Sequence, residues 1–236
     1  MDYQNSQLKV TIAFIMGILG ALLMAGGDWL MIYGDTAFDG TLAWLTRGVA
    51  EIPAGRNSFA MFLAFPAILL YTAGLFGIRN FIENRWERDT YTKLTTIGLT
   101  PWLCLHLFYV MILFVFSWLH ANGHAEIACE LGEAMFDQFA WIVVVAEAIM
   151  VIPFLYMFIL ILRGRTVLPK WFAFNNPLIY YIVLKLITLI MPDTGLRLAF
   201  VNGLMSESMM ICFALFLWAT DRYLTHTYKL SKFPVR

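Results

Sequence analysis

Six long apolar runs constrain the fold of this chain more than any other feature of its sequence. A helix that crosses the hydrocarbon core of a bilayer, about 30 Å thick, needs about 20 mostly apolar residues. The runs that reach or approach that length cover residues 10–33, 58–79, 95–120, 138–162, 177–192 and 197–220. The sequence therefore predicts an all-α polytopic bundle of six transmembrane helices, which form a single transmembrane domain over residues 1–236.

The composition places the chain outside the range of soluble proteins. Hydrophobic residues make up 61% of the chain and charged residues 14%, whereas soluble domains have about 45–50% and about 25%. The formal net charge is zero, so no basic excess points to a nucleic-acid partner. The first apolar run is too long for the core of a signal peptide, and we expect it to be retained as a span. The expected partner is the lipid bilayer.

The distribution of lysine and arginine between the predicted loops predicts the orientation. Basic residues gather in both tails and in the second and fourth loops, whereas the opposite side holds only Arg47, Arg56 and Arg197. Short loops rich in lysine and arginine remain in the cytoplasm. We therefore expect a multi-pass protein of the cell (plasma) membrane with both termini in the cytoplasm.

The predicted outer loops look structured. The first, over residues 34–57, is long and semi-apolar, and we expect a short helix there that lies on the membrane interface around Trp44. The loop between the third and fourth spans has acidic residues at helical spacing and no lysine or arginine, which favours an acidic helical turn or two. Its acids are Glu126, Glu130, Glu133 and Asp137.

Ionisable side chains inside the predicted spans need a physical reason. A charged side chain at the centre of a membrane helix costs about 2.5–3.5 kcal/mol on insertion scales, so a neighbour must compensate it or it must be neutral. Lys185 and Glu207 are predicted at comparable depths on two adjacent helices. We therefore expect an ion pair between these two residues.

The polar residues of the spans come from five of the six predicted helices, mostly in the middle or outer half of the membrane. Converging on one point satisfies such groups without water at the lowest cost, which predicts a polar cavity that opens toward the outer face. The alternative is a set of separate hydrogen bonds and one ion pair that only hold the bundle together. The candidate ligand-binding or proton-coupling residues are Asp28, His106, Glu147, Lys185, Asn202 and Glu207.

A second group of polar residues lies in the acidic outer loop. His120, His124 and Glu126 spell HxxxHxE, and two histidines four apart on one helix are half of a zinc site. Asn122 and Gly123 favour a turn instead, and no third strong ligand follows, so we expect no metal. The chain also lacks Walker, GxSxG and HExxH motifs and an axial histidine pair, so no cofactor is expected.

One short motif carries a resemblance. The first run contains "GILGA" and ends in "GGDWLMIYG", residues 26–34. This motif, together with six predicted spans in about 230 residues, resembles an uncharacterised family of small bacterial multispan membrane proteins in which a glycine and an aspartate close the first helix. Such families have no assigned activity, so the resemblance implies no catalytic residue.

Three functions remain open on these grounds. The first is binding or transport of a small polar or cationic solute, with protons exchanged at Asp28, Glu147 or Glu207. The alternatives are an intramembrane enzyme that acts on a lipid or isoprenoid, with His106 and a carboxylate as acid and base, and a nonenzymatic membrane subunit or sensor. A transporter of this size is expected to work as a homo-oligomer. The small residues between Gly17 and Gly27 are either a dimer seam or a packing surface within one chain.

Overall fold

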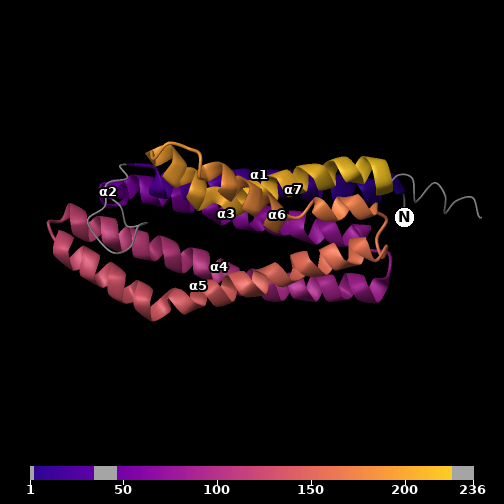
Figure 1. Ribbon diagram of the computed structural model, residues 1–236, viewed down its shortest axis with the longest axis horizontal. Coiled ribbons are helices and arrows are strands. Elements are labelled where there is room, and N and C mark those ends of the chain that lie inside the picture. The colour runs from indigo at the N-terminus through magenta and orange to yellow at the C-terminus, as the bar shows by residue number, and fades with distance from the viewer. Residues whose placement is uncertain (1–2, 35–46, 225–236) are drawn as a thin grey trace, which may run out of the picture.

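The computed structural model describes residues 3–34 and 47–224, and within these ranges its regular elements are helices, joined by turns and short irregular segments (Figure 1). Long helices run side by side, with the hairpin of α4 and α5 packed against the remaining helices. The helices are α1 (Tyr3–Ile32), α2 (Arg47–Ala50), α3 (Ala54–Ile78), α4 (Arg85–Ala121), α5 (Ala125–Leu162), α6 (Pro177–Thr188) and α7 (Gly195–Ala219).

Five of these helices are long and apolar enough to cross a membrane: α1, α3, α4, α5 and α7. The all-α multispan class is therefore confirmed, but the prediction of six full spans is wrong at the fifth. Helix α6 has 12 residues. At 1.5 Å per residue it is about 18 Å long, well short of a hydrocarbon core of about 30 Å.

Two buried asparagines explain why α6 is short. Asn175 Nδ2 donates to the carbonyl oxygen of Cys212 at 3.2 Å, and Asn176 Nδ2 donates to that of Phe154 at 3.2 Å. Both bonds reach residues about two turns before the ends of α7 and α5, so the chain is already inside the bundle when α6 begins. Asn176 Oδ1 also accepts from the backbone N–H of Leu178, which caps the new helix.

The predicted outer loops also differ from the structure. The acidic segment after His120 belongs mostly to α5, because α4 and α5 are joined by a turn at residues 122–124, in which Gly123 has φ +81°. Its helical spacing was predicted, but its helix continues directly into the next span. The first outer loop contains the single turn of α2, and its Trp44 lies outside the described residues.

Helices α1 and α7 are antiparallel, which defines two ends of the bundle. We call the end where α1 begins the near end and the other the far end. Phe14 stacks on Phe216 near the end of α7, whereas Gly34 contacts Gly195 at its start. Because the segment after α6 returns the chain to the far end, the described part of the chain begins and finishes at the near end (Figure 1).

Helices α1 and α3 meet along a seam of small residues. A Cβ atom on Gly20 would lie 2.4 Å from the backbone nitrogen of Tyr71, and one on Gly17 would lie 2.8 Å from the Cα of Gly74. Real side chains do not approach so closely, so these glycines allow the two backbones to touch. Of the two uses predicted for this stripe, packing within one chain is the one observed.

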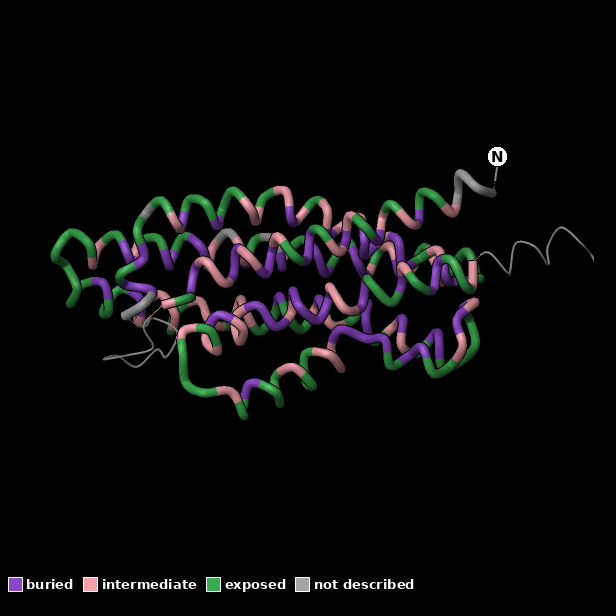
Figure 2. Tube along the Cα trace, turned by 90° about the horizontal axis from the view of Figure 1, so that it is seen from above, coloured by how far each residue is buried: buried purple, intermediate pink, exposed green. Residues whose placement is uncertain are grey.

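Aromatic side chains fill the near end between these helices. Phe216 has ring contacts with Phe14, Phe81 and Phe172, with centroids 5.2–5.5 Å apart, and all four side chains are buried. Toward the outside, exposed residues recur along every long helix (Figure 2). Many of them are large and hydrophobic, for example Phe65 and Ile190, as expected for surfaces that face lipid rather than water.

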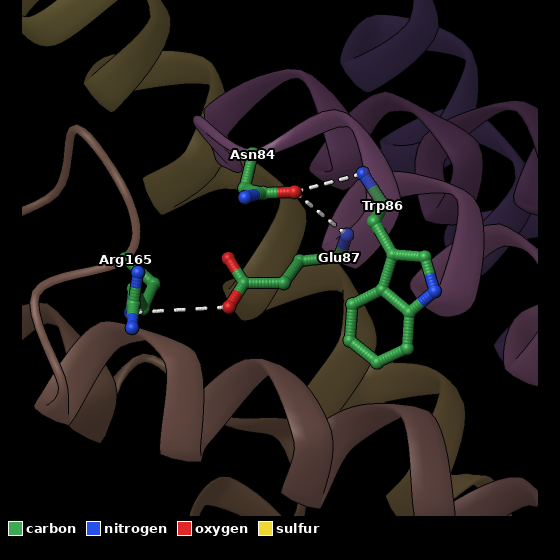
Figure 3. A network of polar contacts seen from close by, with 4 residues as sticks. All are labelled: Asn84, Trp86, Glu87 and Arg165. Carbon is green, nitrogen blue, oxygen red and sulfur yellow. Dashed lines mark hydrogen bonds and ion pairs between the residues drawn. The ribbon is translucent and has the colours of Figure 1, made fainter.

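The start of α4 is held at the near end by a small polar network (Figure 3). Asn84 Oδ1 accepts from the backbone N–H groups of Trp86 at 2.8 Å and Glu87 at 3.4 Å, which is an N-cap. Glu87 also lies 3.9 Å from the guanidinium of Arg165, in the segment after α5. The basic second and fourth predicted loops therefore meet at the end where α1 begins.

Candidate functional site

Asp28 lies in α1 about one turn before the helix ends at Ile32, and only 8% of its surface is exposed. Ser206 of α7 donates a hydrogen bond to Oδ2 at 3.1 Å. The amide of Asn202 donates to the backbone oxygen of Asp28 at 3.2 Å. The aspartate is thus held by the adjacent helix, while its Oδ1 makes no hydrogen bond to any described residue.

The partners of Asp28 come from the most polar segment of α7. Asn202 and Ser206 are four residues apart, so they share one face of the helix, as their spacing predicts. Asn202 Oδ1 accepts a hydrogen bond from the hydroxyl of Tyr109 in α4 at 3.3 Å. Three helices are therefore linked through one amide side chain.

Glu207 points to the other side of the same segment. Its Oε1 accepts from the indole nitrogen of Trp29 at 2.9 Å. Its Oε2 is buried and has no hydrogen-bond partner among the described residues. Gly203 makes room for this contact, because a Cβ there would lie 2.9 Å from the Trp29 nitrogen and 3.2 Å from Glu207 Oε1.

A cavity of about 390 Å³ lies between α1, α4, α5 and α7, and we call it the polar cavity. Four of the six residues predicted from the sequence line it, from four different helices: Asp28, His106, Glu147 and Asn202. Ser206, Tyr109 and Trp102 add polar groups, and apolar side chains of α4, α5 and α7 form the rest of the wall. The full lining is Asp28, Trp102, Leu105, His106, Phe108, Tyr109, Ile112, Met135, Phe136, Phe139, Ala140, Val143, Glu147, Asn202, Met205 and Ser206.

The hydrogen bond of His106 determines its tautomer. Nδ1 lies 2.8 Å from the carbonyl oxygen of Trp102. Because a carbonyl oxygen only accepts, Nδ1 carries the proton, and Nε2 of the neutral ring keeps its lone pair. The imidazole also packs edge-on against the Trp102 indole, with centroids 4.0 Å apart. The lone pair makes no hydrogen bond to a described residue.

Glu147 lies near the middle of α5, where it is exposed while also lining the polar cavity. No hydrogen bond or ion pair to a described residue involves it. An acid in this position stands at the rim of the cavity rather than in its interior.

Lys185 lies apart from the other candidate residues. It lies on the exposed face of α6 and does not line the polar cavity. Neither Lys185 nor Glu207 takes part in an ion pair with a described residue, so the predicted ion pair between them is absent. The two residues do lie on neighbouring helices, α6 and α7, as predicted. Their side chains point in different directions, however, since Lys185 is exposed and Glu207 is buried.

The histidines of the outer segment do not share one helical face. His120 belongs to the last turn of α4 and His124 is the N-cap residue of α5, on the other side of the turn. Glu126 follows in the first turn of α5. Within residues 3–34 and 47–224, no three histidine, cysteine, aspartate or glutamate side chains come together as potential metal ligands.

The polar cavity has an unbalanced charge. Its lining includes the carboxyl groups of Asp28 and Glu147 but no lysine or arginine. Glu207 adds a third acid close to Asp28, bonded to the indole of Trp29. A carboxyl group removed from water is either neutral or accompanied by a cation. The arrangement can therefore hold protons or a positively charged group.

Two contributors were not recognised in the sequence. Trp29 stands near the end of its span, where tryptophan is typical of the interfacial belt, so its bond to Glu207 carried no sequence signal. Arg56 of α3 donates to the backbone oxygens of Leu30 and Tyr33 and so caps α1 just beyond Asp28. The sequence does not indicate this cap, because Arg56 is 23 residues or more away from both of its partners along the chain.

The fold and this site define a class: a multi-pass α-helical membrane protein with a cavity between its helices. The comparison with family models makes the assignment more specific. Residues 1–223 match the model of a family of unknown function (DUF6796), so the chain belongs to that family. No curated protein and no solved structure matches the chain.

Proposed function

We propose that this protein binds a small cationic solute in the polar cavity, with the carboxylate of Asp28 as the counter-charge. The observation that carries the proposal is the surplus of acid in the cavity wall, where Asp28 and Glu147 face no lysine or arginine. Asp28 is oriented by Ser206 and Asn202, so one carboxylate oxygen is fixed while the other remains available. A pre-oriented acid in a partly dry cavity is the arrangement that organic cations need.

The mixture of groups around Asp28 also suits an ammonium group. Nε2 of His106 and the hydroxyl of Tyr109 are polar, and the Trp102 ring lines the same wall. Aromatic faces attract cations, especially where water is scarce. An anion would meet the two carboxylates and gain none of these contacts.

The sidedness follows from the sequence. The basic second and fourth predicted loops lie at the near end, which we therefore place in the cytoplasm. Asp28 then lies in the outer half of the membrane. The aromatic cluster around Phe216 separates it from the cytoplasm, so a solute would reach the site from outside or from the bilayer. Transport would require that cluster to open.

The test uses the full chain in lipid nanodiscs and two probes of similar size, ethylammonium and ethanol. Isothermal titration calorimetry should show binding of ethylammonium only. Asp28→Asn should weaken that binding at least tenfold, because the amide cannot balance the positive charge. Asp89→Asn is the matched control, since Asp89 is exposed on α4 and outside the cavity. Equal affinities for the wild type and both variants, or equal affinities for both probes, would overturn the proposal.

A second candidate is an intramembrane enzyme that acts on a lipid, favoured by the free lone pair on Nε2 of His106. A base in this cavity could remove a proton from a bound substrate. It needs an acid within hydrogen-bond reach, however, and none of the described carboxylates forms a hydrogen bond with His106. Incubation with membrane lipids, followed by mass spectrometry against a His106→Gln variant, separates the candidates: a product that only the wild type forms favours the enzyme.

A further inference from the structure

A second cavity, of about 290 Å³, lies between α1, α3 and α4, and we call it the apolar cavity. Its wall consists of methionine, phenylalanine, leucine, isoleucine, valine, alanine and glycine side chains, apart from two residues. These two are Asp28 and His106, which also line the polar cavity. One carboxyl group and one imidazole therefore stand in the walls of both cavities.

The rim of the apolar cavity lies on the outer surface of the bundle. Phe65 is 76% exposed and Leu69 is 65% exposed, and both line the cavity. They lie in the middle of α3, within the candidate membrane span Gly55–Phe81. At that depth the surroundings of the bundle are hydrocarbon, so the cavity opens sideways to lipid rather than to water.

The space inside the apolar cavity depends on small residues. Gly27 and Ala64 contribute little volume to its wall. From Met61 to Leu69 the lining follows two turns of α3, which is about 12 Å of helix length. The lining of the cavity thus follows the axes of α1 and α3, as the chains of the neighbouring lipids do.

We propose that the ligand of this protein is an amphiphile, with a cationic amine head at Asp28 and one hydrocarbon chain in the apolar cavity. This inference rests on the proposed function, and it adds the chemical class of the ligand and its route of entry. The amine leaves the bilayer sideways between α3 and α4, its head reaches the shared wall, and its chain stays in surroundings like those it left.

The two halves of the ligand contribute differently. A hydrocarbon chain gains little from the hydrophobic effect when it leaves lipid, because lipid tails are as apolar as the wall, so its contribution is close packing against the side chains that line the apolar cavity. The main driving force is the contact between the ammonium group and the carboxylate of Asp28, a residue that is only 8% exposed and is aligned by Ser206. The shape of the apolar cavity then selects for a single chain. A small hydrophilic cation would bind at Asp28 and leave the apolar cavity unfilled.

The experiment measures binding of alkylammonium ions with 4, 8 and 12 carbon atoms to the full chain in nanodiscs, with dodecanol as the neutral probe. Longer chains partition more strongly into lipid, so affinities are expressed per probe concentration within the membrane. We expect dodecylammonium to bind at least tenfold more tightly than butylammonium on that scale, and dodecanol to bind no more tightly than butylammonium. An affinity that does not depend on chain length overturns the inference.

Two variants separate the head from the chain. Ala64→Phe should fill the apolar cavity, remove the dependence on chain length and leave ethylammonium binding in place. Ala214→Phe is the matched control, because Ala214 is exposed on α7 and lines neither cavity. If ethylammonium binds through Asp28 but chain length has no effect, only the inference fails. If ethylammonium binding does not depend on Asp28, the proposed function fails with it.

A labelling experiment on the wild type keeps the inference testable if Ala64→Phe does not fold. Dodecylamine with a photoreactive diazirine at the end of its chain is irradiated in the nanodisc, and labelled peptides are mapped by mass spectrometry. Labels should gather on α3 between Met61 and Leu69. Labels on α5 or α6 at the same intensity would show that the chain lies elsewhere and would overturn the inference.

Discussion

The indole nitrogen of Trp29 donates a hydrogen bond to Oε1 of Glu207 at 2.9 Å, across the contact between the first and last long helices. The two residues are 178 positions apart in the sequence, and Gly203 provides the space in which they meet. Since Oε2 of Glu207 already lacks a partner among the described residues, this bond is the one that satisfies the buried acid.

Replacing Trp29 with phenylalanine should therefore destabilise the bundle. It leaves both oxygens of Glu207 without a described partner, and an unpaired buried polar group costs about 1–3 kcal/mol. The free energy of unfolding in detergent is the measurement, with Trp141→Phe as the control because Trp141 is 61% exposed. The double variant Trp29→Phe, Glu207→Met should lose less than the sum of the single losses. Additive losses would show that the two residues are not coupled.

Gly20→Ala should disrupt the contact between α1 and α3. The added Cβ would lie 2.4 Å from the backbone nitrogen of Tyr71 and 2.8 Å from the oxygen of Ala67, and neither atom can move without its helix. Overpacking of this kind costs about 1–3 kcal/mol. Gly55→Ala is the same change with no atom within 4 Å of the new Cβ, so it should be neutral or slightly stabilising. Thermal unfolding of both variants makes the comparison, and equal melting temperatures would contradict it.

Arg56→Gln should loosen the end of α1. The guanidinium donates to the backbone oxygens of Leu30 and Tyr33, and a cation at a helix C-terminus contributes about 0.3–2 kcal/mol. Hydrogen exchange should become faster in the peptides that cover residues 28–34 and remain unchanged near Gly17. Arg163→Gln, at an exposed position after α5, is the control. Unchanged exchange at the end of α1 would show that the cap has no effect.

Cation binding should weaken as the pH falls, because a proton and an ammonium group compete for the same carboxylate. The titratable groups near Asp28 are Glu207 on α7, His106 and Tyr109 on α4 and Tyr71 on α3. Calorimetry with ethylammonium between pH 8 and pH 5 measures the effect. Glu207→Gln should still bind the probe with the same dependence, since its carboxyl is bonded to Trp29 outside the cavity wall. Loss of binding in Glu207→Gln, with retention in Asp28→Asn, would assign the role to Glu207 instead.

The sequence predicted the membrane helices well, because one physical quantity, the length of an apolar run, decides whether a helix can span the bilayer. The length of an apolar run predicts a membrane helix, and five of the six predicted runs are helices long enough to span. It was wrong where tertiary contacts decide: α6 is short because Asn175 and Asn176 bind neighbouring helices before it begins. Hydropathy also missed how far α5 continues through the acidic segment, since helix formation does not require apolar residues.

The site could be predicted in part for a similar reason. Asn202 and Ser206 are four residues apart, a spacing that places them on one face of a helix, and both bind Asp28. The pair of Lys185 and Glu207 was wrong because depth specifies the height of a residue and not its rotation about the helix axis. Lys185 and Tyr181 share a face by the same four-residue rule, and both are exposed. The sequence shows which residues share one face of a helix. The direction in which that face points depends on how the helix packs against its neighbours.

Helices α4 and α5 continue past the far end of α1. Tyr109 is level with Asp28 through Asn202, and from there α4 extends about 18 Å to Ala121, whereas α1 extends about 6 Å to Ile32. The first turns of α5 bear exposed acids, among them Glu126 and Glu130. Such a projection attracts counter-ions over about 10 Å at 0.1 M salt. Cations would be enriched there before any of them meets Asp28, so added salt should slow their arrival more than it speeds their departure.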